Sequence, residues 1–435
     1  MKPYPAYKDS GVEWLGVVPA GWKPIKLRHL CSKIGSGTTP LGGRLGYQDE
    51  GVLFIRSQNV HFSGLRLDDV AFITSDVHQA MSVSVVHPGD VLLNITGASI
   101  GRCTTVPRLF PLANVNQHVC ILRPISTRVA AKFLEFALRS ARTQSLIDVL
   151  NQGSSRQGLN FSQIAGFHLA LPPLSEQRGI VAFLDRETGH IDDLVSRYET
   201  LISLLQERRQ SLISHTVTKG LDPNAPMKDS GVEWLGEVPA EWEPGVLKYL
   251  CEVVAGQSPS STEVEEIDLG LLPFLQGNAE FGSTTPLPAY CCESAPRRCV
   301  PGDILISVRA PVGALNIAER VYGIGRGLCA VRAKAVEAHF LWWLLKASGH
   351  QLHAVAVGTT YDAVTAQDID HLWCAVPPLS EQRAIAAFLD QETARIDELI
   401  SKATKAIGLL KERRTALISA VVTGKIDVRG GVLDG

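Results

Sequence analysis

Apolar residues recur every seven positions along two long stretches of this chain. The positions are Leu184, Ile191, Tyr198, Leu205 and Leu212 in the first stretch, and Leu389, Ile396, Ala403, Leu410 and Leu417 in the second. A heptad pattern sustained over four repeats is typical of a coiled-coil seam. We therefore predict two long helices that pack against each other through these ten residues. A single amphipathic helix buried on a globular core is the alternative, and it explains neither the length nor the second copy.

Each helical stretch begins with the same phrase, PPLSEQR, at residues 172–178 and 377–383. Two prolines do not continue a helix and serine is a favourable N-cap, so we expect the first helix to be capped by Ser175. The two copies then stay in register at an offset of 205 residues. A stretch of roughly 40 residues at about 1.5 Å each predicts a rod of about 55–60 Å.

A second phrase, KDSGVEWLG, also occurs twice, at residues 8–16 and 228–236. In each copy, the segment between KDSGVEWLG and PPLSEQR differs in sequence and in length from its counterpart. Some framework survives, because PGDVLLNITGASIG at 88–101 resembles PGDILISVRAPVG at 301–313, and both predict strand, turn, strand. The chain is thus organised as variable, constant, variable, constant, which is a pseudo-dimer within one polypeptide.

The order of these parts constrains the fold. The simplest closure has the second helix run back antiparallel to the first, with the variable domains at opposite ends of a spacer and Lys425 near Lys8. We expect an α+β protein: two globular α/β domains joined by two long antiparallel coiled-coil helices, with internal pseudo-two-fold symmetry. The predicted boundaries are 1–172 for the first domain, 173–220 for the first helical region, 221–377 for the second domain, 378–427 for the second helical region and 428–435 for a flexible tail.

The composition is that of a soluble globular protein, with 45% apolar and 20% charged residues among 435. No apolar run is long enough to span a membrane, and the nine cysteines occur without a secretory signal, which favours a reduced, cytoplasmic location. The cysteines lack the spacing of a zinc site, so no metal is expected. The net charge of −2 argues against a strong, independent nucleic-acid binder. It allows one that shares phosphate neutralisation with partners.

Two unlike heads on a repeated frame suit duplex DNA, in which half-sites recur at each helical turn of about 34–36 Å. The layout, the YKDSGVEWLG opening, the PPLSEQR phrases and the GQSPSS, PFLQG and GIGRGLC text of the second variable region resemble the specificity subunit of type I restriction–modification enzymes. The resemblance covers essentially the whole chain.

The resemblance implies a role in defence against foreign DNA. Each of two target-recognition domains would read one half of an asymmetric bipartite site on double-stranded DNA. The helices would act as spacer and docking platform for two methyltransferase (modification) subunits, and two restriction (translocase–nuclease) subunits would join the full complex.

The chain lacks the motifs of its expected partners. An adenine methyltransferase needs an Asp- or Asn-Pro-Pro-aromatic loop, and residues 171–174 and 376–379 have only the prolines. No phosphate-binding G-x-x-x-x-G-K-[ST] loop occurs. We therefore expect a non-catalytic subunit. Adenine methylation and DNA cleavage would belong to the partners, with S-adenosylmethionine, ATP and Mg²⁺ bound there.

Candidate DNA-binding residues are polar or basic side chains in glycine-containing loops and near strand ends of both variable regions. They are Thr38, Thr39, Arg56, Gln58, Asn59, Asn116, Gln117, Ser154, Ser155, Arg156 and Gln157 in the first region, and Gln257, Ser258, Gln276, Asn278, Arg309, Arg326, Thr359, Thr360 and Tyr361 in the second. For any one of them, a solvated loop residue or turn former is the alternative, and base contacts are not separated from phosphate contacts.

Two rival functions stay open at this point. A coiled-coil adaptor that bridges two protein partners without reading DNA would have the same spacer and the same near-neutral charge. It would not explain why the heads differ yet keep polar glycine loops at matching places. A self-contained methyltransferase–nuclease is the enzyme alternative, and the missing cofactor loop counts against it.

Overall fold

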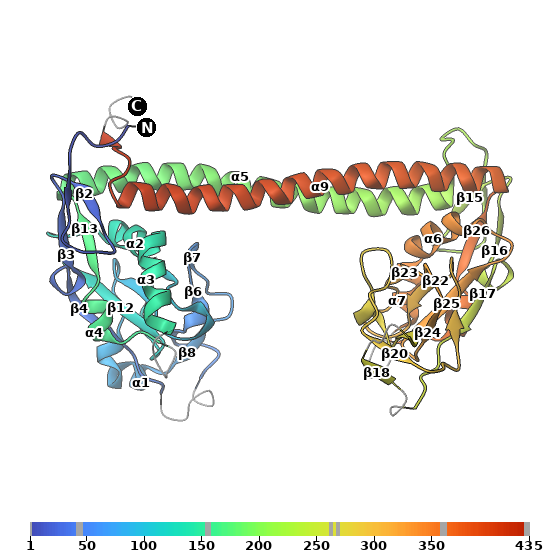
Figure 1. Ribbon diagram of the computed structural model, residues 1–435, viewed down its shortest axis with the longest axis horizontal. Helices are drawn as coiled ribbons and strands as arrows, with labels where there is room; N and C mark the ends of the chain where they lie inside the picture. Colours follow the sequence, from blue (N-terminus) through green and yellow to red (C-terminus); the bar gives the residue numbers. More distant parts are fainter. Residues whose placement is uncertain are drawn as a thin grey trace. The chain divides into compact units, whose positions relative to one another are not determined.

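The computed structural model describes residues 2–40, 47–152, 158–260, 264–266, 270–356 and 363–429. The chain divides into two compact units, Met1–Tyr198 with Lys405–Gly435, and Glu199–Thr404. The division falls within both long helices, so that each unit contains one variable region and part of each helix (Figure 1). Below, the first head is the part of the chain before the first long helix, and the second head is the part between the two. The predicted flexible tail lies outside the described residues from residue 430 onward.

Both long helices are present and continuous. Helix α5 spans Leu174–Lys219 with 46 residues, and α9 spans Leu379–Val422 with 44. The expected cap was wrong, because α5 begins at Leu174 and Ser175 lies inside its first turn. The N–H of Gln177 donates to the carbonyl of Pro173 at 2.9 Å, so the helical turn already closes on the proline. A proline is tolerated there because the missing amide hydrogen would have no helical partner.

The two helices run antiparallel where they pack within each unit. In the first unit Arg414 of α9 contacts Asp192 of α5 at 3.1 Å. In the second unit the equivalent residues exchange helices, and Arg209 of α5 contacts Asp397 of α9 at 3.0 Å. All ten predicted seam residues are buried or half-buried. The expected fold of two α/β domains with long antiparallel helices is confirmed, and the repeated ion pair shows its internal symmetry.

The first head is built on two sheets. An antiparallel four-stranded sheet has the order β10-β9-β12-β4, and a three-stranded sheet has the order β11-β5-β8. Their bounds are β4 Cys31–Ser36, β5 Val52–Ile55, β8 Ala71–Ile73, β9 Val91–Asn94, β10 Cys103–Thr105, β11 Ala113–Val115 and β12 Val119–Pro124. Around them lie β1 Tyr7–Asp9, β2 Val17–Pro19, β3 Lys23–Lys26, β6 Val60–His61, β7 Gly64–Leu65, β13 His168–Leu171, α1 Ser75–Ala80, α2 Ala131–Arg139, α3 Ala141–Gln152 and α4 Phe161–Ala165.

The second head repeats this plan. Its antiparallel four-stranded sheet has the order β17-β25-β22-β23, and its five-stranded sheet has the order β18-β20-β19-β24-β21. The strands are β17 Cys251–Ala255, β18 Val264–Glu266, β19 Leu272–Leu275, β20 Tyr290–Cys292, β21 Arg298–Cys299, β22 Ile304–Ser307, β23 Leu315–Ile317, β24 Tyr322–Ile324 and β25 Leu328–Ala333. Around them lie β14 Met227–Asp229, β15 Glu237–Pro239, β16 Glu243–Val246, β26 Trp373–Val376, α6 Ala338–Ala347, α7 Gly349–Val355 and α8 Ala366–Asp370.

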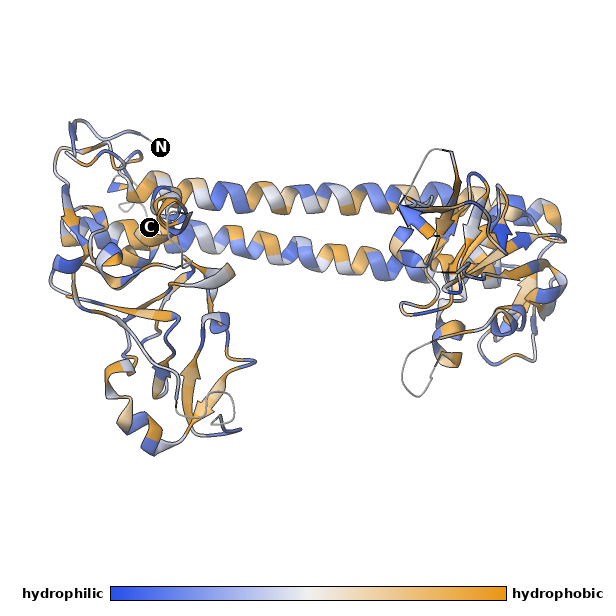
Figure 2. Cartoon of the chain, turned by 60° about the horizontal axis from the view of Figure 1, so that its bottom comes forward, coloured by the Kyte–Doolittle hydropathy of each residue, from blue (hydrophilic) through white to orange (hydrophobic). Residues whose placement is uncertain are grey.

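The four-stranded sheet is the middle layer of each head. On β9, Val91 and Leu93 belong to the core that contains α2 and the long helices, whereas Leu92 belongs to the core shared with the three-stranded sheet. On β22, Ile304 and Leu305 divide in the same way between the two cores of the second head. Successive side chains on a strand point to opposite faces, so a continuous apolar run indicates burial on both sides. In each PGD segment the predicted first strand and the turn after it are confirmed, whereas the second strand begins just beyond the segment, at Cys103 and at Leu315. Figure 2 shows hydrophobic residues along strands of both heads.

A buried glutamine attaches each head to the start of a long helix. Gln177 is fully buried; its Oε1 accepts the N–H of Ala130 at 2.9 Å, and its Nε2 donates to the carbonyls of Pro172 and Arg128. Gln382 repeats this, accepting the N–H of Glu337 at 2.7 Å. The PPLSEQR phrase therefore occurs twice because each head needs the same attachment.

The preceding glutamate makes a second attachment. Glu176 accepts the indole N–H of Trp22 at 3.0 Å and the hydroxyl of Tyr4 at 2.6 Å. In the second unit Glu381 accepts the indole N–H of Trp242 at 3.0 Å. Each tryptophan follows a KDSGVEWLG phrase, so the two repeated phrases meet in space at the helix start. A buried indole N–H needs such an acceptor.

The chain ends lie together in the first unit. The Tyr7 hydroxyl donates to the carbonyl of Gly424 at 3.0 Å, which confirms the expected closeness of Lys8 and Lys425. Gly424 has φ +72°, and a Cβ there would lie 2.3 Å from Cγ of Pro19, so glycine is required at this turn. In the part of the chain that the structure describes, no helix is long and apolar enough to cross a membrane.

We expect Gln177→Ala to destabilise the first unit by about 2–4 kcal/mol. The substitution leaves the buried N–H of Ala130 and the carbonyl of Pro172 without partners, and each such group costs about 1–3 kcal/mol. Urea unfolding of the intact chain measures the change. The neighbouring Arg178→Ala is the control, because Arg178 is exposed and its removal should change stability by less than about 0.5 kcal/mol. Equal effects of the two substitutions would contradict this assignment.

The first unit should also lose stability in acid through Glu135 of α2. Burial alone would raise the pKa of Glu135, but Lys132 at 2.8 Å, the N–H of Thr105 and Arg139 at 2.9 Å together hold it below its ordinary value. A depressed pKa contributes stability above the unfolded-state value, and this stability is lost as the pH falls through the folded-state value. Thermal melting between pH 7 and pH 3 should show the loss in the wild type. A Glu135→Gln variant should have a smaller pH dependence, and an unchanged dependence would refute the role.

Candidate nucleic-acid interface

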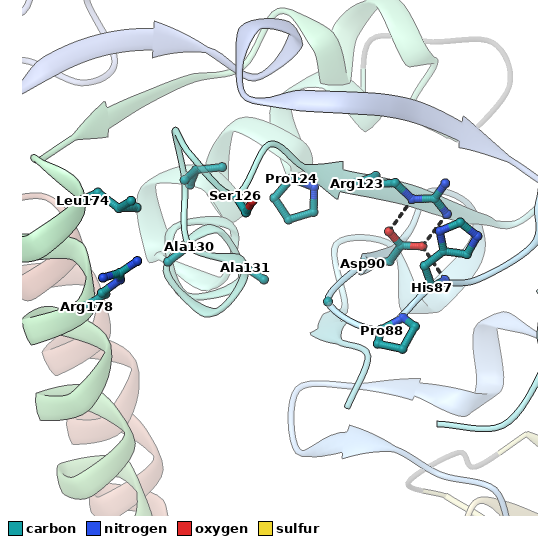
Figure 3. A pocket seen from close by; sticks show the side chains of 12 residues that line it. His87, Pro88, Asp90, Arg123, Pro124, Ser126, Ala130, Ala131, Leu174 and Arg178 are labelled. Carbon is teal, nitrogen blue, oxygen red and sulfur yellow. Dashed lines mark hydrogen bonds and ion pairs between the residues drawn. The ribbon is translucent and has the colours of Figure 1, made fainter. Parts of the chain in front are cut away.

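The shared PGD phrase is a structural turn rather than a site for a ligand. Asp90 is buried and accepts two hydrogen bonds from Arg123, each 2.8 Å long, and one from the N–H of His87 at 2.7 Å. Asp303 and Arg332 repeat the pair at 2.8 Å in the second head. The hydrogen bonds to the aspartates raise the pKa of both arginines. Figure 3 shows the first pair beside a cavity of about 390 Å³ that Arg178 also lines.

Loops at one edge of the four-stranded sheet form the polar tip of the first head. They follow β4 and β9 and precede β12, which meet at the same edge because the strands are antiparallel. There the Thr39 hydroxyl donates to Oε1 of Gln117 at 2.5 Å, and Nε2 of Gln117 lies 3.0 Å from Nε2 of His118. Nδ1 of His118 lies 2.6 Å from the Thr96 hydroxyl. Thr38, Thr39 and Gln117 are exposed, so the structure brings these predicted residues to one surface.

Sequence reasoning missed His118 and Thr96. Both continue the hydrogen-bonded chain from Gln117, and only the pairing of β9 with β12 brings them together. The one sequence signal was the position of His118 directly after the predicted Asn116-Gln117 pair.

A second group of predicted residues follows β5 and is largely occupied within the protein. Arg56 and Gln58 both donate to Asp69, at 3.0 Å to its carbonyl and 2.6 Å to its carboxylate respectively. Asn59 is only 2% exposed, accepts the N–H of Arg56 and donates to two carbonyls, one of them that of Asp69. Asn116 is also buried, and its Oδ1 caps the next turn. Asn59 therefore shapes its loop with both ends of its amide, and the Oδ1 of Asn116 is used within its own turn.

In the second head, five predicted residues line one open cavity of about 810 Å³. They are Ser258, Gln276, Asn278, Arg309 and Arg326. The loops that carry them follow β17, β19 and β22 and precede β25, which matches the tip of the first head. Gln276, Arg309 and Arg326 are exposed, and the Ser258 hydroxyl accepts the backbone N–H of Arg326 at 3.3 Å. Gln257 is exposed nearby without lining the cavity.

The remaining predicted loops, Ser154, Ser155, Arg156 and Gln157 together with Thr359, Thr360 and Tyr361, lie outside the described residues. Their described neighbours do reach the tips. Gly158 forms a β-bridge with Thr96, and Ala363 forms one with Arg309. Sequence reasoning also missed Glu280, Tyr290 and Phe274 in the cavity of the second head.

The exposed side chains at these tips are hydrogen-bond donors and acceptors. Within the described ranges, no group of three or more His, Cys, Asp or Glu side chains could hold a metal ion. All nine cysteines are buried, and burial raises the pKa of Cys120 to about 12, which keeps its thiol protonated at neutral pH. Amides, hydroxyls and arginines in open loops suit hydrogen bonding to base edges and phosphates.

Comparison with known proteins identifies the class. The family described as "Type I restriction modification DNA specificity domain" matches residues 19–196 and 239–408, so it is found once in each copy of the repeat. The chain belongs to this family.

Individual relatives agree. The MjaX type I restriction enzyme specificity subunit of Methanocaldococcus jannaschii is 26% identical over 425 residues, which cover 95% of this chain and 96% of that protein. The EcoKI specificity subunit of Escherichia coli is 21% identical over 46% of this chain and 44% of its own length.

Solved structures share the fold over nearly the whole chain. One, from work on complex assembly and conformational transition of the type I R–M system, has a TM-score of 0.76 and 25% identity, and covers 94% of this chain and 99% of its own. The HsdS subunit from Thermoanaerobacter tengcongensis has a TM-score of 0.55 at 24% identity, covering 94% and 98%.

We expect Arg326→Ala to weaken binding of the full chain to duplex DNA of any sequence. Loss of one phosphate contact should reduce the slope of log affinity against log salt by about 0.9. Gel shifts of the full chain at several salt concentrations measure this. Arg320→Ala removes the same charge from the same head away from the cavity, where Arg320 contacts Glu319, and should leave the slope unchanged. The same slope for both variants would argue against a phosphate contact at Arg326.

Proposed function

We propose that this chain is the DNA-recognition subunit of a type I restriction–modification complex, and that each head reads one half of an asymmetric, two-part site. One observation carries the proposal. Both heads place polar loops at the same edge of the same sheet, yet the side chains there differ: Thr39, Gln117 and His118 form one tip, whereas Arg309 and Arg326 stand at the other. Two different half-sites require the same supporting sheet with different side chains in the loops that contact the bases.

The balance of charge supports a shared interface. Base readers give specificity, while most affinity for DNA comes from phosphate contacts and counterion release. With a net charge of −2, this chain would rely on partner subunits for much of that neutralisation. Each recognition head would then select the sequence within a complex that holds the duplex.

The long helices support docking of one kind of partner twice. Leu194 and Leu399 occupy the same place in the two copies and are 43% and 45% exposed, and Leu204 and Leu409 are 56% and 57% exposed. Exposed leucines on two repeated surfaces favour two copies of the same protein. We infer that these are methyltransferase subunits, and that two restriction subunits join the full complex.

In this proposal the chain itself is non-catalytic. Adenine methylation and DNA cleavage, together with S-adenosylmethionine, ATP and Mg²⁺, belong to the partners, and the complex acts in the cytoplasm. What the described residues of this chain contribute is the arrangement of hydrogen-bonding side chains at two tips.

Methylation mapping by long-read sequencing tests this function. Cells that carry the complete system should methylate one interrupted, asymmetric sequence. Replacing residues 1–170 by another head should change one half of that sequence and leave the other half as it was. A change in both halves would contradict independent heads, and the absence of any two-part site would favour the adaptor alternative.

The helices should set the gap between the two half-sites. Deleting one heptad from each, residues 205–211 and 410–416, removes about 10 Å of helix, which corresponds to about three base pairs, and keeps the exposed leucines of the docking surfaces. We therefore expect methylation at a site whose gap is about three base pairs shorter. The same mapping experiment measures it, and methylation with the original gap would show that the helices do not determine the spacing.

A further inference from the structure

The cavity of the second head has a carboxylate in its wall that sequence reasoning did not single out. Glu280 is the last residue of a single 3₁₀ turn, Asn278–Glu280, and is 6% exposed. It lines the cavity together with Gln276, Arg309 and Arg326. Its Oε2 accepts the N–H of Gly277 at 3.1 Å. No second hydrogen bond and no ion pair of this carboxylate occurs among the residues that the structure describes, although two arginines line the same cavity.

The first head shows what the turn itself requires. Its equivalent turn, Ser57–Asn59, ends on Asn59, whose Oδ1 accepts the N–H of Arg56 at 2.9 Å. The side-chain NH2 group of Asn59 donates to two backbone carbonyls, at 2.9 and 3.0 Å. A neutral amide therefore closes this turn. The negative charge of Glu280 goes beyond that structural need.

Glu280 lines the cavity, and its Oε1 has no hydrogen-bond partner among the described residues, so this oxygen is available to accept a hydrogen bond from a ligand. The charge also limits what the ligand can be. A phosphate is repelled by the carboxylate and should stay with Arg309 and Arg326, which are exposed. A carboxylate oxygen accepts from a donor, and base pairs present donors in the major groove through the exocyclic amino groups of cytosine and adenine.

We propose that Glu280 determines specificity in the second half-site by accepting a hydrogen bond from the exocyclic amino group of one base, N4 of cytosine or N6 of adenine. This inference rests on the proposed function. The arginines of the cavity hold the sugar–phosphate backbone, and the carboxylate distinguishes a base that carries the amino group from one that does not. Asn59 has no such role in the first head, because its amide is already used.

The variant Glu280→Gln tests the assignment. Glutamine keeps one oxygen for the N–H of Gly277, so the turn is retained, but it replaces an acceptor by a donor. In cells with the complete system, we expect methylation of the wild-type site to fall about 5- to 150-fold and one base pair of the second half-site to be relaxed or changed. The first half-site should stay as it is. Glu293→Gln is the matched control, because Glu293 is exposed in the same head and does not line the cavity.

Base analogues identify the base. In duplexes carrying the mapped site, purine replaces each adenine of the second half-site in turn, and pyrimidin-2-one replaces each cytosine, which removes one amino group at a time. At one position the wild-type complex should lose about 5- to 150-fold in affinity, whereas Glu280→Gln should lose nothing further there.

Two results would overturn the proposal. One is unchanged methylation by Glu280→Gln. The other is that each base analogue, at every position of the second half-site, lowers the affinity of Glu280→Gln as much as it lowers that of the wild type. Failure of the underlying function looks different, since the wild-type system would then show no two-part site. Loss of both half-sites in Glu280→Gln with a lowered melting temperature would assign Glu280 a structural role and also reject the proposal.

Discussion

A fully buried glutamine at the start of each long helix is the interaction on which the rest of this structure depends. Gln177 and Gln382 each satisfy backbone groups of their own head and of the Pro-Pro turn before the helix. The neighbouring glutamate accepts a buried indole N–H from the strand region of the same head. Buried polar groups tolerate few alternatives. The two copies therefore share the KDSGVEWLG and PPLSEQR motifs, which form these junctions, while the residues between the motifs differ from one copy to the other.

The arginine–aspartate pairs apply the same constraint further inside each head. Asp90 with Arg123, and Asp303 with Arg332, tie a turn to the neighbouring strand of the middle sheet. Among the described residues, the loops at the opposite ends of these strands have no ion pair that is repeated in both heads. Each head is therefore constant where it meets the helices and variable at its tip, which is the division of labour that reading two different half-sites demands. The unlike tips and the single carboxylate of Glu280 are consequences of this freedom.

Sequence reasoning succeeded where apolar residues recur at a regular spacing or where a segment is repeated in the chain. The heptads located both helices to within a few residues, and the first strand of each PGD segment was recognised as an apolar run between two glycine-containing turns. It failed at Ser175, since propensity for a cap was overridden by the carbonyl of Pro173. Among the candidate binding residues, loop composition did not distinguish Asn59, which is consumed by its own loop, from Gln117, which is exposed.

By itself, the sequence determined that this protein is a doubled chain with two long helices, two related heads and polar loops, because repeats and periodicity are visible in one dimension. The tertiary structure alone decided which polar side chains share a surface. Thr96, Gln117 and His118 meet only through strand pairing, and Glu280 lines one cavity together with Arg309 and Arg326, which come from separate loops. The amide of Asn59 is fully hydrogen-bonded within its loop, whereas one carboxylate oxygen of Glu280 has no partner among the described residues. This difference depends on how the surrounding loops fold, and no local sequence pattern encodes it.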